Sequence, residues 1–183
     1  MTEYILSVAA RDRSGIIAEL SGALFELGGN ILAATQTVLH DYFAMMILCE
    51  MDREIDQEDI RKKLNQGVRS EFNLFVTKRQ PALMKPTETQ PFVITLVGPD
   101  RPGILNALAS YLASKQINID DLRCKTTDAE FIVICQVSVP VDLDVAMLQA
   151  DLEETGRSLQ FKANMQHENV FVATNQLRFG RAT

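Results

Sequence analysis

The chain of 183 residues lacks several features that mark common classes of protein. It has no tryptophan, only two histidines, and three cysteines of which none forms a CxxC pair. Isolated cysteines in odd number (Cys49, Cys124 and Cys135) predict buried thiols in a reducing cytoplasm and argue against a disulfide framework. Neither His40 nor His167 has a His or Cys partner at metal-ligand spacing, so we expect no metal site and no cofactor.

Long apolar runs and an excess of positive charge are also missing. No run approaches the roughly 18 residues that a membrane-spanning helix needs, and the N-terminal residues do not resemble a signal peptide. We therefore expect a cytoplasmic protein with no membrane partner. The net charge of −6 argues against direct binding to nucleic acid, because neutralising phosphates needs a basic face. Nucleophile motifs, phosphate loops and paired-carboxylate sites do not occur, so no catalytic residue is expected.

What the sequence does contain is a repeat. The segment YILSVAARDRSGIIAELSGALFELGGNI at 4–31 matches FVITLVGPDRPGILNALASYLASKQINI at 92–119 without a gap. The separation is 88 residues throughout, as between Asp12 and Asp100. Two copies are too few for a solenoid, so the match predicts two copies of one supersecondary unit.

A proline-rich segment separates the two copies. The sequence KRQPALMKPTETQP at 78–91 contains three prolines and little apolar content, which predicts an extended linker. We therefore expect one domain at 1–79, a linker at 80–90, and a second domain with a C-terminal tail at 91–183. In the tail, the short run Val170–Val172 suggests an edge strand or a docking segment, with disorder beyond about residue 177.

Apolar periodicity within each copy alternates between that of strands and that of helices. The first copy predicts strands at 3–10, 30–39, 43–51 and 72–78, with helices at 16–27 and 56–68. The second predicts strands at 91–97, 118–126, 131–139 and 158–166, with helices starting at Ile104 and over 142–155. Gly28 and Gly156 are expected to end helices, and Asp56 to cap one. The order βαββαβ, found twice, predicts an α+β fold of two ferredoxin-like units, each an antiparallel four-stranded sheet with both helices on one face.

Both copies place a charged turn between the first strand and the first helix. The start of a helix has unpaired N–H groups and the positive end of the helix dipole, which suit an amino-acid carboxylate. We expect Pro102 in the first helical turn and Ser14 as an N-cap. Asn30 and Asn118 are candidate acceptors for the ligand's ammonium group. The candidate ligand-binding residues are Asp12, Arg13, Ser14, Gly15, Ile16, Asn30, Asp100, Arg101, Pro102, Gly103, Ile104 and Asn118.

A plainer interpretation of these turns stays open. Asp12 and Asp100 suit the capping or bracing of a loop, and Arg13 and Arg101 suit a solvated surface as well as they suit a carboxylate. In that case each corner is only a capped turn.

These motifs carry a family resemblance. The sequences DRPGIL at 100–105 and NI at 118–119, repeated as DRSGII at 12–17 and NI at 30–31, resemble those of the ACT domain family of small-molecule sensing modules. The whole architecture is similar to tandem-ACT proteins of the glycine cleavage system transcriptional repressor type. The resemblance implies that ACT units pair side by side and bind an amino acid where the first loop and helix of one unit meet the second strand of another.

Three functional hypotheses follow. The first is a non-enzymatic amino-acid sensor for glycine or another small amino acid, acting on a protein partner such as a transcription regulator of glycine cleavage genes, with homodimerisation left open. The second is a regulatory subunit of, or a fragment related to, an ACT-containing enzyme such as formyltetrahydrofolate deformylase. The third is that the sheet face binds RNA. The acidic net charge argues against this hypothesis, and so does the third strand of the second copy, in which Phe131 is the only aromatic residue.

Overall fold

The computed structural model describes residues 1–66, 72–80, 88–127 and 130–176, and the chain forms two compact units, Met1–Leu83 (unit 1) and Met84–Thr183 (unit 2). Four sequence predictions fall wholly or partly outside the described residues: the end of the helix expected at 56–68, most of the linker, the hairpin at 128–129 and the chain end beyond 176. Among the described residues, no helix is long and apolar enough to cross a membrane.

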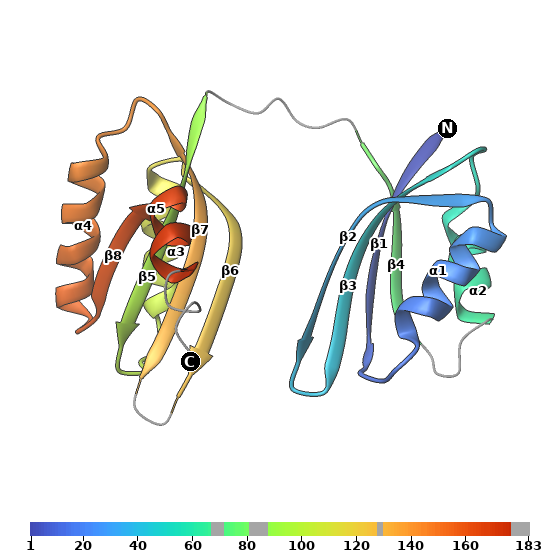
Figure 1. Cartoon of the computed structure of the whole chain (residues 1–183), viewed down its shortest axis with the longest axis horizontal. Coiled ribbons are helices and arrows are strands. Elements are labelled where there is room, and N and C mark those ends of the chain that lie inside the picture. The colour runs from blue at the N-terminus through green and yellow to red at the C-terminus, as the bar shows by residue number, and fades with distance from the viewer. Residues whose placement is uncertain (67–71, 81–87, 128–129, 177–183) are drawn as a thin grey trace. The chain divides into compact units, whose positions relative to one another are not determined.

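Unit 1 has the predicted βαββαβ order. Its elements are β1 (Thr2–Arg11), α1 (Ile16–Glu26), β2 (Gly29–Leu39), β3 (Tyr42–Met51), α2 (Gln57–Gln66) and β4 (Asn73–Lys78). The strands form an antiparallel sheet in the order β2-β3-β1-β4, with α1 and α2 on one side (Figure 1).

Unit 2 repeats this arrangement. Its elements are β5 (Thr89–Gly98), α3 (Ile104–Ser114), β6 (Asn118–Thr126), β7 (Phe131–Pro140), α4 (Val145–Ser158), β8 (Lys162–His167) and α5 (Glu168–Gln176). The sheet order is β6-β7-β5-β8, again antiparallel. The predicted fold of two ferredoxin-like units is confirmed.

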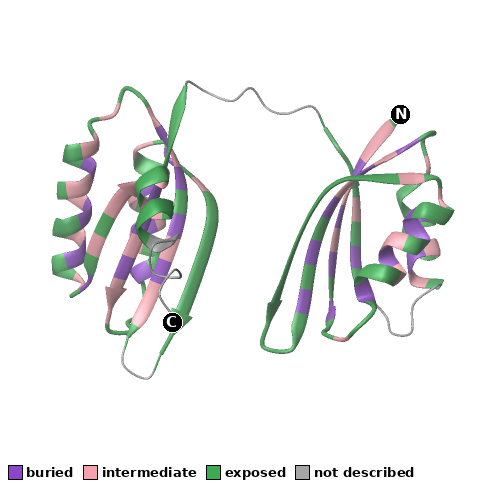
Figure 2. Ribbon diagram, in the orientation of Figure 1, coloured by how far each residue is buried: buried purple, intermediate pink, exposed green. Residues whose placement is uncertain are grey.

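Each unit has its own core between the sheet and its helices. In β1, the alternate residues Tyr4, Leu6 and Val8 are buried toward α1 and α2, as the pleat of a strand requires (Figure 2). The helices contribute residues three and four apart, such as Ile16 and Leu20 of α1. In unit 2 the alternation is clear in β7, where Val133, Cys135 and Val137 are buried, whereas β5 buries three consecutive residues, Phe92–Ile94.

A bulge recurs near the start of the second strand of each unit. The pairing register shifts between Ile31 and Ala33 in β2 and between Ile119 and Asp121 in β6, which leaves Leu32 and Asp120 as the extra residues. These two positions are equivalent in the repeat, so the duplication preserves a local irregularity as well as the element order.

The tail differs from the sequence prediction. The edge strand suggested at Val170–Val172 is wrong, because these residues lie in helix α5, which packs against β5 and β8. A run of only three apolar residues does not distinguish a strand from a helix. In the helix, Val170 and Val172 are exposed and Phe171 is half-buried.

Two further local predictions need correction. Gly156 does not end α4, which continues to Ser158. A Cβ at Gly156 would lie 2.7 Å from the carbonyl oxygen of Phe161, so this glycine permits close packing of the chain leading into β8. On the strand predicted at 43–51, core packing is also the expectation for Met45, Met46 and Met51, but Met46 points away from the helices and is 51% exposed. By contrast Gly28, at φ 75°, follows α1 as predicted, and Asp56 caps α2, since its Oδ1 accepts from the N–H of Glu58 at 2.8 Å.

Candidate ligand-binding corners

The two corners share one backbone conformation. Gly15 and Gly103 are the N-caps of α1 and α3, each in the left-handed region at φ 95°. Their carbonyl oxygens accept the first intrahelical bonds, from Glu19 and Ala107, at 2.9 Å. No side chain accepts a hydrogen bond at either cap. The first N–H groups of both helices therefore face outward without a side-chain cap, as a carboxylate site requires.

The N-cap expected at Ser14 and the place in the first helical turn expected for Pro102 are both wrong. Both residues lie in the turn before the glycine N-cap. The tight turn from strand to helix needs one residue at positive φ, and glycine adopts that conformation at the lowest cost. The helix therefore starts after the glycine, at Ile16 and Ile104.

The arginines of the two corners have different partners. Arg13 donates to Glu19 from Nη1 at 2.8 Å and from Nη2 at 2.6 Å, which raises the pKa of its guanidinium above its ordinary value. Residue 107, the equivalent of Glu19, is alanine, and Arg101 instead donates to the side-chain oxygen of Gln160.

This difference determines how open each corner is. A Cβ at Gly103 would meet no described atom within 4 Å, whereas one at Gly15 would lie 3.9 Å from both Arg13 Nη1 and Glu19 Oε1. The Glu19 carboxylate also stands in the first turn of α1, where it already interacts with the positive end of the helix. The second corner is therefore the one that leaves its helix start accessible to an external anion.

The aspartates hold the corners to neighbouring hairpin strands. The N–H of Asp12 donates to the carbonyl oxygen of Asp41 at 2.7 Å, in the turn between β2 and β3. In unit 2, Thr126 Oγ1 at the end of β6 donates to Asp100 Oδ2 at 3.5 Å. These contacts position the loops and leave the helix starts uncovered.

The two asparagines lie away from the corners of their own units. Asn30 and Asn118 stand near the start of β2 and at the start of β6, after the C-terminal ends of α1 and α3. A helix of 11 residues separates each asparagine from its own corner by about 16 Å. Each amide donates to a carboxylate, Asn30 to Glu50 at 3.0 Å and Asn118 to Asp120 at 2.7 Å.

A cleft of about 730 Å³ surrounds Asn118. Three carboxylates line it, those of Glu88, Asp120 and Asp142, together with the single ammonium group of Lys115. Asp120, the bulge residue, also accepts from Ser138 Oγ at 2.6 Å. This excess of acceptors suits the ammonium group of a ligand, the half of an amino acid that a helix start does not bind.

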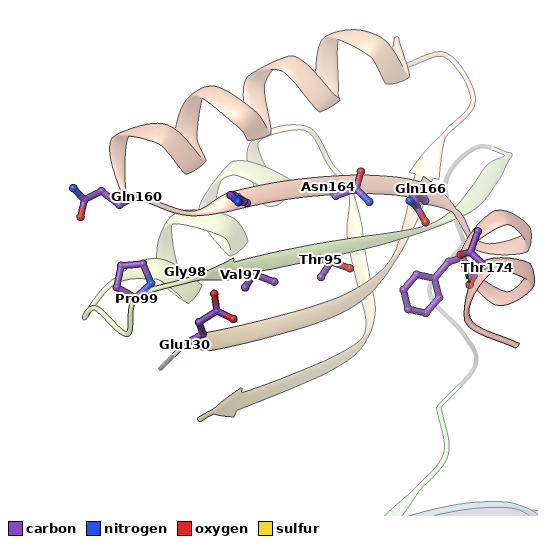
Figure 3. Close-up of a pocket in the computed structure, with 11 residues that line it drawn as sticks. Thr95, Val97, Gly98, Pro99, Glu130, Gln160, Asn164, Gln166 and Thr174 are labelled. Carbon is purple, nitrogen blue, oxygen red and sulfur yellow. Dashed lines mark hydrogen bonds between the residues drawn. The ribbon is translucent and has the colours of Figure 1, made fainter. Parts of the chain in front are cut away.

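Sequence reasoning missed a second cleft, of about 820 Å³, on the side of the unit 2 sheet opposite α3 and α4. Figure 3 shows Thr95 and Val97 of β5, Asn164 and Gln166 of β8, and Thr174 of α5 around it. The only sequence feature that could have indicated a polar surface on this side of the sheet is the alternation of polar residues along β8. Phe171 and Thr174 of α5 line one end of this cleft, and the periodicity of the tail did not predict that helix.

Metal-binding groups and reactive thiols are the other chemistry to consider in the described residues. Within the described ranges no group of three or more His, Cys, Asp or Glu side chains could hold a metal ion. Cys49 and Cys135 are buried as predicted, whereas the prediction of burial is wrong for Cys124, which is exposed on β6. Burial raises the pKa of Cys49 and Cys135 to about 11, so both thiols are almost fully protonated at neutral pH.

Family models and relatives place the chain among known proteins. Two ACT domain models match, one over residues 4–66 and one over 90–166. A UPF0237 protein of Methanococcus maripaludis is 38% identical over 80 residues, which make up 43% of this chain and 89% of that protein. That relative thus corresponds in length to about one unit.

Solved structures resemble the whole chain. An unknown protein from Galdieria sulphuraria has a TM-score of 0.78 at 24% identity, covering 91% of this chain and 98% of that one. A protein provisionally assigned as a glycine cleavage system transcriptional repressor has a TM-score of 0.67 at 15% identity, covering 90% and 96%. At these identities the likeness concerns the fold. With both family models matching, the chain belongs to the ACT domain family and contains two ACT domains.

Proposed function

We propose that this ACT-domain protein is a non-enzymatic regulator that binds a small amino acid, with glycine as the leading candidate. The observation that carries the proposal is the open helix start at Gly103. The first N–H groups of α3 follow this glycine N-cap, no side chain caps them, and no described atom would contact a Cβ at Gly103. A carboxylate accepts from such N–H groups and is further stabilised by the helix dipole.

The ammonium group of the ligand binds among the acceptors beside Asn118 or Asn30. A small amino acid cannot bridge the length of α3, so the corner and the asparagine of one unit do not act on the same ligand molecule. We infer that a second ACT unit supplies the asparagine side of the site, in the way that the family resemblance implies.

The two corners are not equivalent in this proposal. An incoming carboxylate at Gly15 has to compete with Glu19 for both Arg13 and the helix start. At Gly103 no acidic residue stands in the first turn of the helix. The second corner is therefore the stronger site.

Regulation then follows from coupling between ligand and partner. The bound amino acid stabilises the conformation that binds a protein partner more tightly, or more weakly, than the free form does. By the tandem-ACT resemblance, we propose a transcription regulator of glycine cleavage genes as that partner.

Ligand-dependent thermal stability tests the proposal. We expect glycine, serine or alanine at millimolar concentration to raise the melting temperature of the full chain, because a ligand of the native state stabilises it by about 2.7 kcal/mol at 100 times its Kd. Glycolate lacks the ammonium group and methylamine lacks the carboxylate, so neither should give the full shift.

Matched corner variants locate the site. Gly103→Val should abolish the ligand-induced shift, measured against that variant's own ligand-free melting temperature, while Gly15→Val should retain most of it. If none of the twenty amino acids stabilises the chain, the sensor function is wrong. If Gly103→Val responds like the wild type, the site lies elsewhere.

A further inference from the structure

The side of the unit 1 sheet that faces away from α1 and α2 carries large apolar side chains. We call it the unit 1 face, centred on the cross-strand row Thr35–Met46–Ser7–Phe75. Met46 is 51% exposed, Phe75 74% and Leu39 66%. Since the helices cover only the other side of the sheet, no described side chain of unit 1 shields this row from solvent.

Charge is confined to the two ends of this face. On β1, Arg11 lies at one end and Glu3 at the other, and the face residues between them are alanine, serine and isoleucine. On β3, Tyr42 pairs with Arg11 and Glu50 pairs with Glu3. The three rows between these ends contain no charged side chain on any of the four strands, all of which the structure describes.

Unit 2 provides an internal comparison for the same fold. On the equivalent face its second strand has Asp121, Arg123 and Lys125 at positions where unit 1 has alanine and threonines. Helix α5 packs over β5 and β8, and Val93, the counterpart of Ile5, is only 1% exposed. The duplicated fold therefore does not itself require an uncharged, uncovered face; unit 1 alone has one.

We propose that the unit 1 face is a homodimer interface, in which two copies of the chain pack their unit 1 sheets face to face. The end charges favour a second copy as the occupant. Ser7 is four residues from Glu3 and four from Arg11, and Met46 is likewise midway between Tyr42 and Glu50. A two-fold axis along the central row therefore places Arg11 of each copy against the Glu3 end of the other.

This pairing brings opposite charges together and buries the apolar centre. Glu3 is ion-paired with Arg79, and Glu50 accepts from the amide of Asn30, so the Glu3 end retains one carboxylate more than cations. At the other end Arg11, 5.2 Å from the centroid of the Tyr42 ring, is the positive side chain on the face, and the turn residues Asp12 and Asp41 lie just beyond it. Met46 and Phe75 of one copy then meet the same residues of the other, about 10 Å from sheet to sheet, with strands aligned.

Sedimentation equilibrium of the full chain tests this interface. We expect the wild type to be a dimer at micromolar concentration. Phe75→Asp and Met46→Lys, made separately, should each raise the dimer dissociation constant by about 100-fold or more. The reason is that each substitution buries two like charges, one from each copy, at the centre of the interface. Phe25→Asp is the matched control: Phe25 is 81% exposed but lies on α1, away from the face, so its dimer should persist.

Arg11→Glu tests the orientation of the two copies. It should weaken the dimer by about 10-fold at low salt and by less at high salt, because charges at the rim of an interface are screened. Far-ultraviolet circular dichroism checks that each variant is folded. If the wild type is still monomeric at a protein concentration of about 100 μM, the proposal is wrong. It is also wrong if the dimer persists in both Phe75→Asp and Met46→Lys. A dimer unaffected by Arg11→Glu overturns the two-fold arrangement.

Discussion

At the residue scale, the backbone conformation, and not close packing, is what requires glycine at the two corners. Gly103 has φ 95° and ψ −8°, and Gly15 has φ 95° and ψ −7°. Residues with a Cβ reach this region only with strain. Because a Cβ at Gly103 would contact nothing, any loss of stability on substitution there reports the backbone alone.

A pair of glycine-to-alanine substitutions separates this strain from helix propensity. Gly103→Ala should lower the free energy of unfolding by about 1–2 kcal/mol. Gly22→Ala, in the exposed interior of α1 with nothing near its Cβ and no positive φ, should raise it by about 0.5–1 kcal/mol. Urea unfolding of the ligand-free variants measures both. A neutral or stabilising Gly103→Ala would contradict the left-handed cap.

Residue identity predicted where the two corners lie, but it did not predict where their helices start or which partners their arginines have. Both Asp-Arg-x-Gly turns were located by the repeat, yet the helix start was assigned to Ser14 and Pro102 and not to the glycines. Arg13 and Arg101 are equivalent in sequence but have different partners. The partner of Arg13 is six residues away, whereas that of Arg101 is 59 residues away, which no local pattern can show.

At the scale of elements, duplication was the strongest source of prediction. It indicated the order of eight strands and four helices, because segments of one copy could be compared with their counterparts in the other. No helix among the described residues of unit 1 corresponds to α5, and α5 was the element predicted wrongly. Comparison of the repeats therefore could not predict the cleft that Phe171 and Thr174 of α5 help to line, whereas the different charges of the two sheet faces can be read from the aligned second strands.

Removal of α5 should destabilise unit 2 and spare unit 1. A chain ending at His167 exposes Val93, which is 1% exposed in the intact structure. Losing the burial of one valine costs about 1.5–3 kcal/mol. Hydrogen exchange should therefore show faster exchange in β5 and β8 and unchanged protection in β1 and β4, which serve as the control. Equal loss of protection in both units would show that α5 stabilises more than its own sheet.

At the scale of the whole molecule, the two cores are separate and correspond residue by residue. Leu64 of α2 is fully buried in the unit 1 core, and Leu152 of α4, 88 residues later, is 3% exposed in the unit 2 core. Each unit of this size has enough core to unfold as one cooperative domain. The duplicated leucines therefore offer one substitution that can be made in either core alone.

We expect Leu64→Ala and Leu152→Ala to act on different unfolding transitions. Each removes the same buried side chain and should cost about 2–5 kcal/mol, which lowers the melting temperature of a domain of this size by about 10 °C or more. In differential scanning calorimetry, Leu64→Ala should move the transition of unit 1 and leave that of unit 2 in place, with the reverse for Leu152→Ala. Dimerisation through the unit 1 face adds a further test, because only the unit 1 transition should then rise with protein concentration. If either substitution moves both transitions together, the two units unfold as one cooperative body.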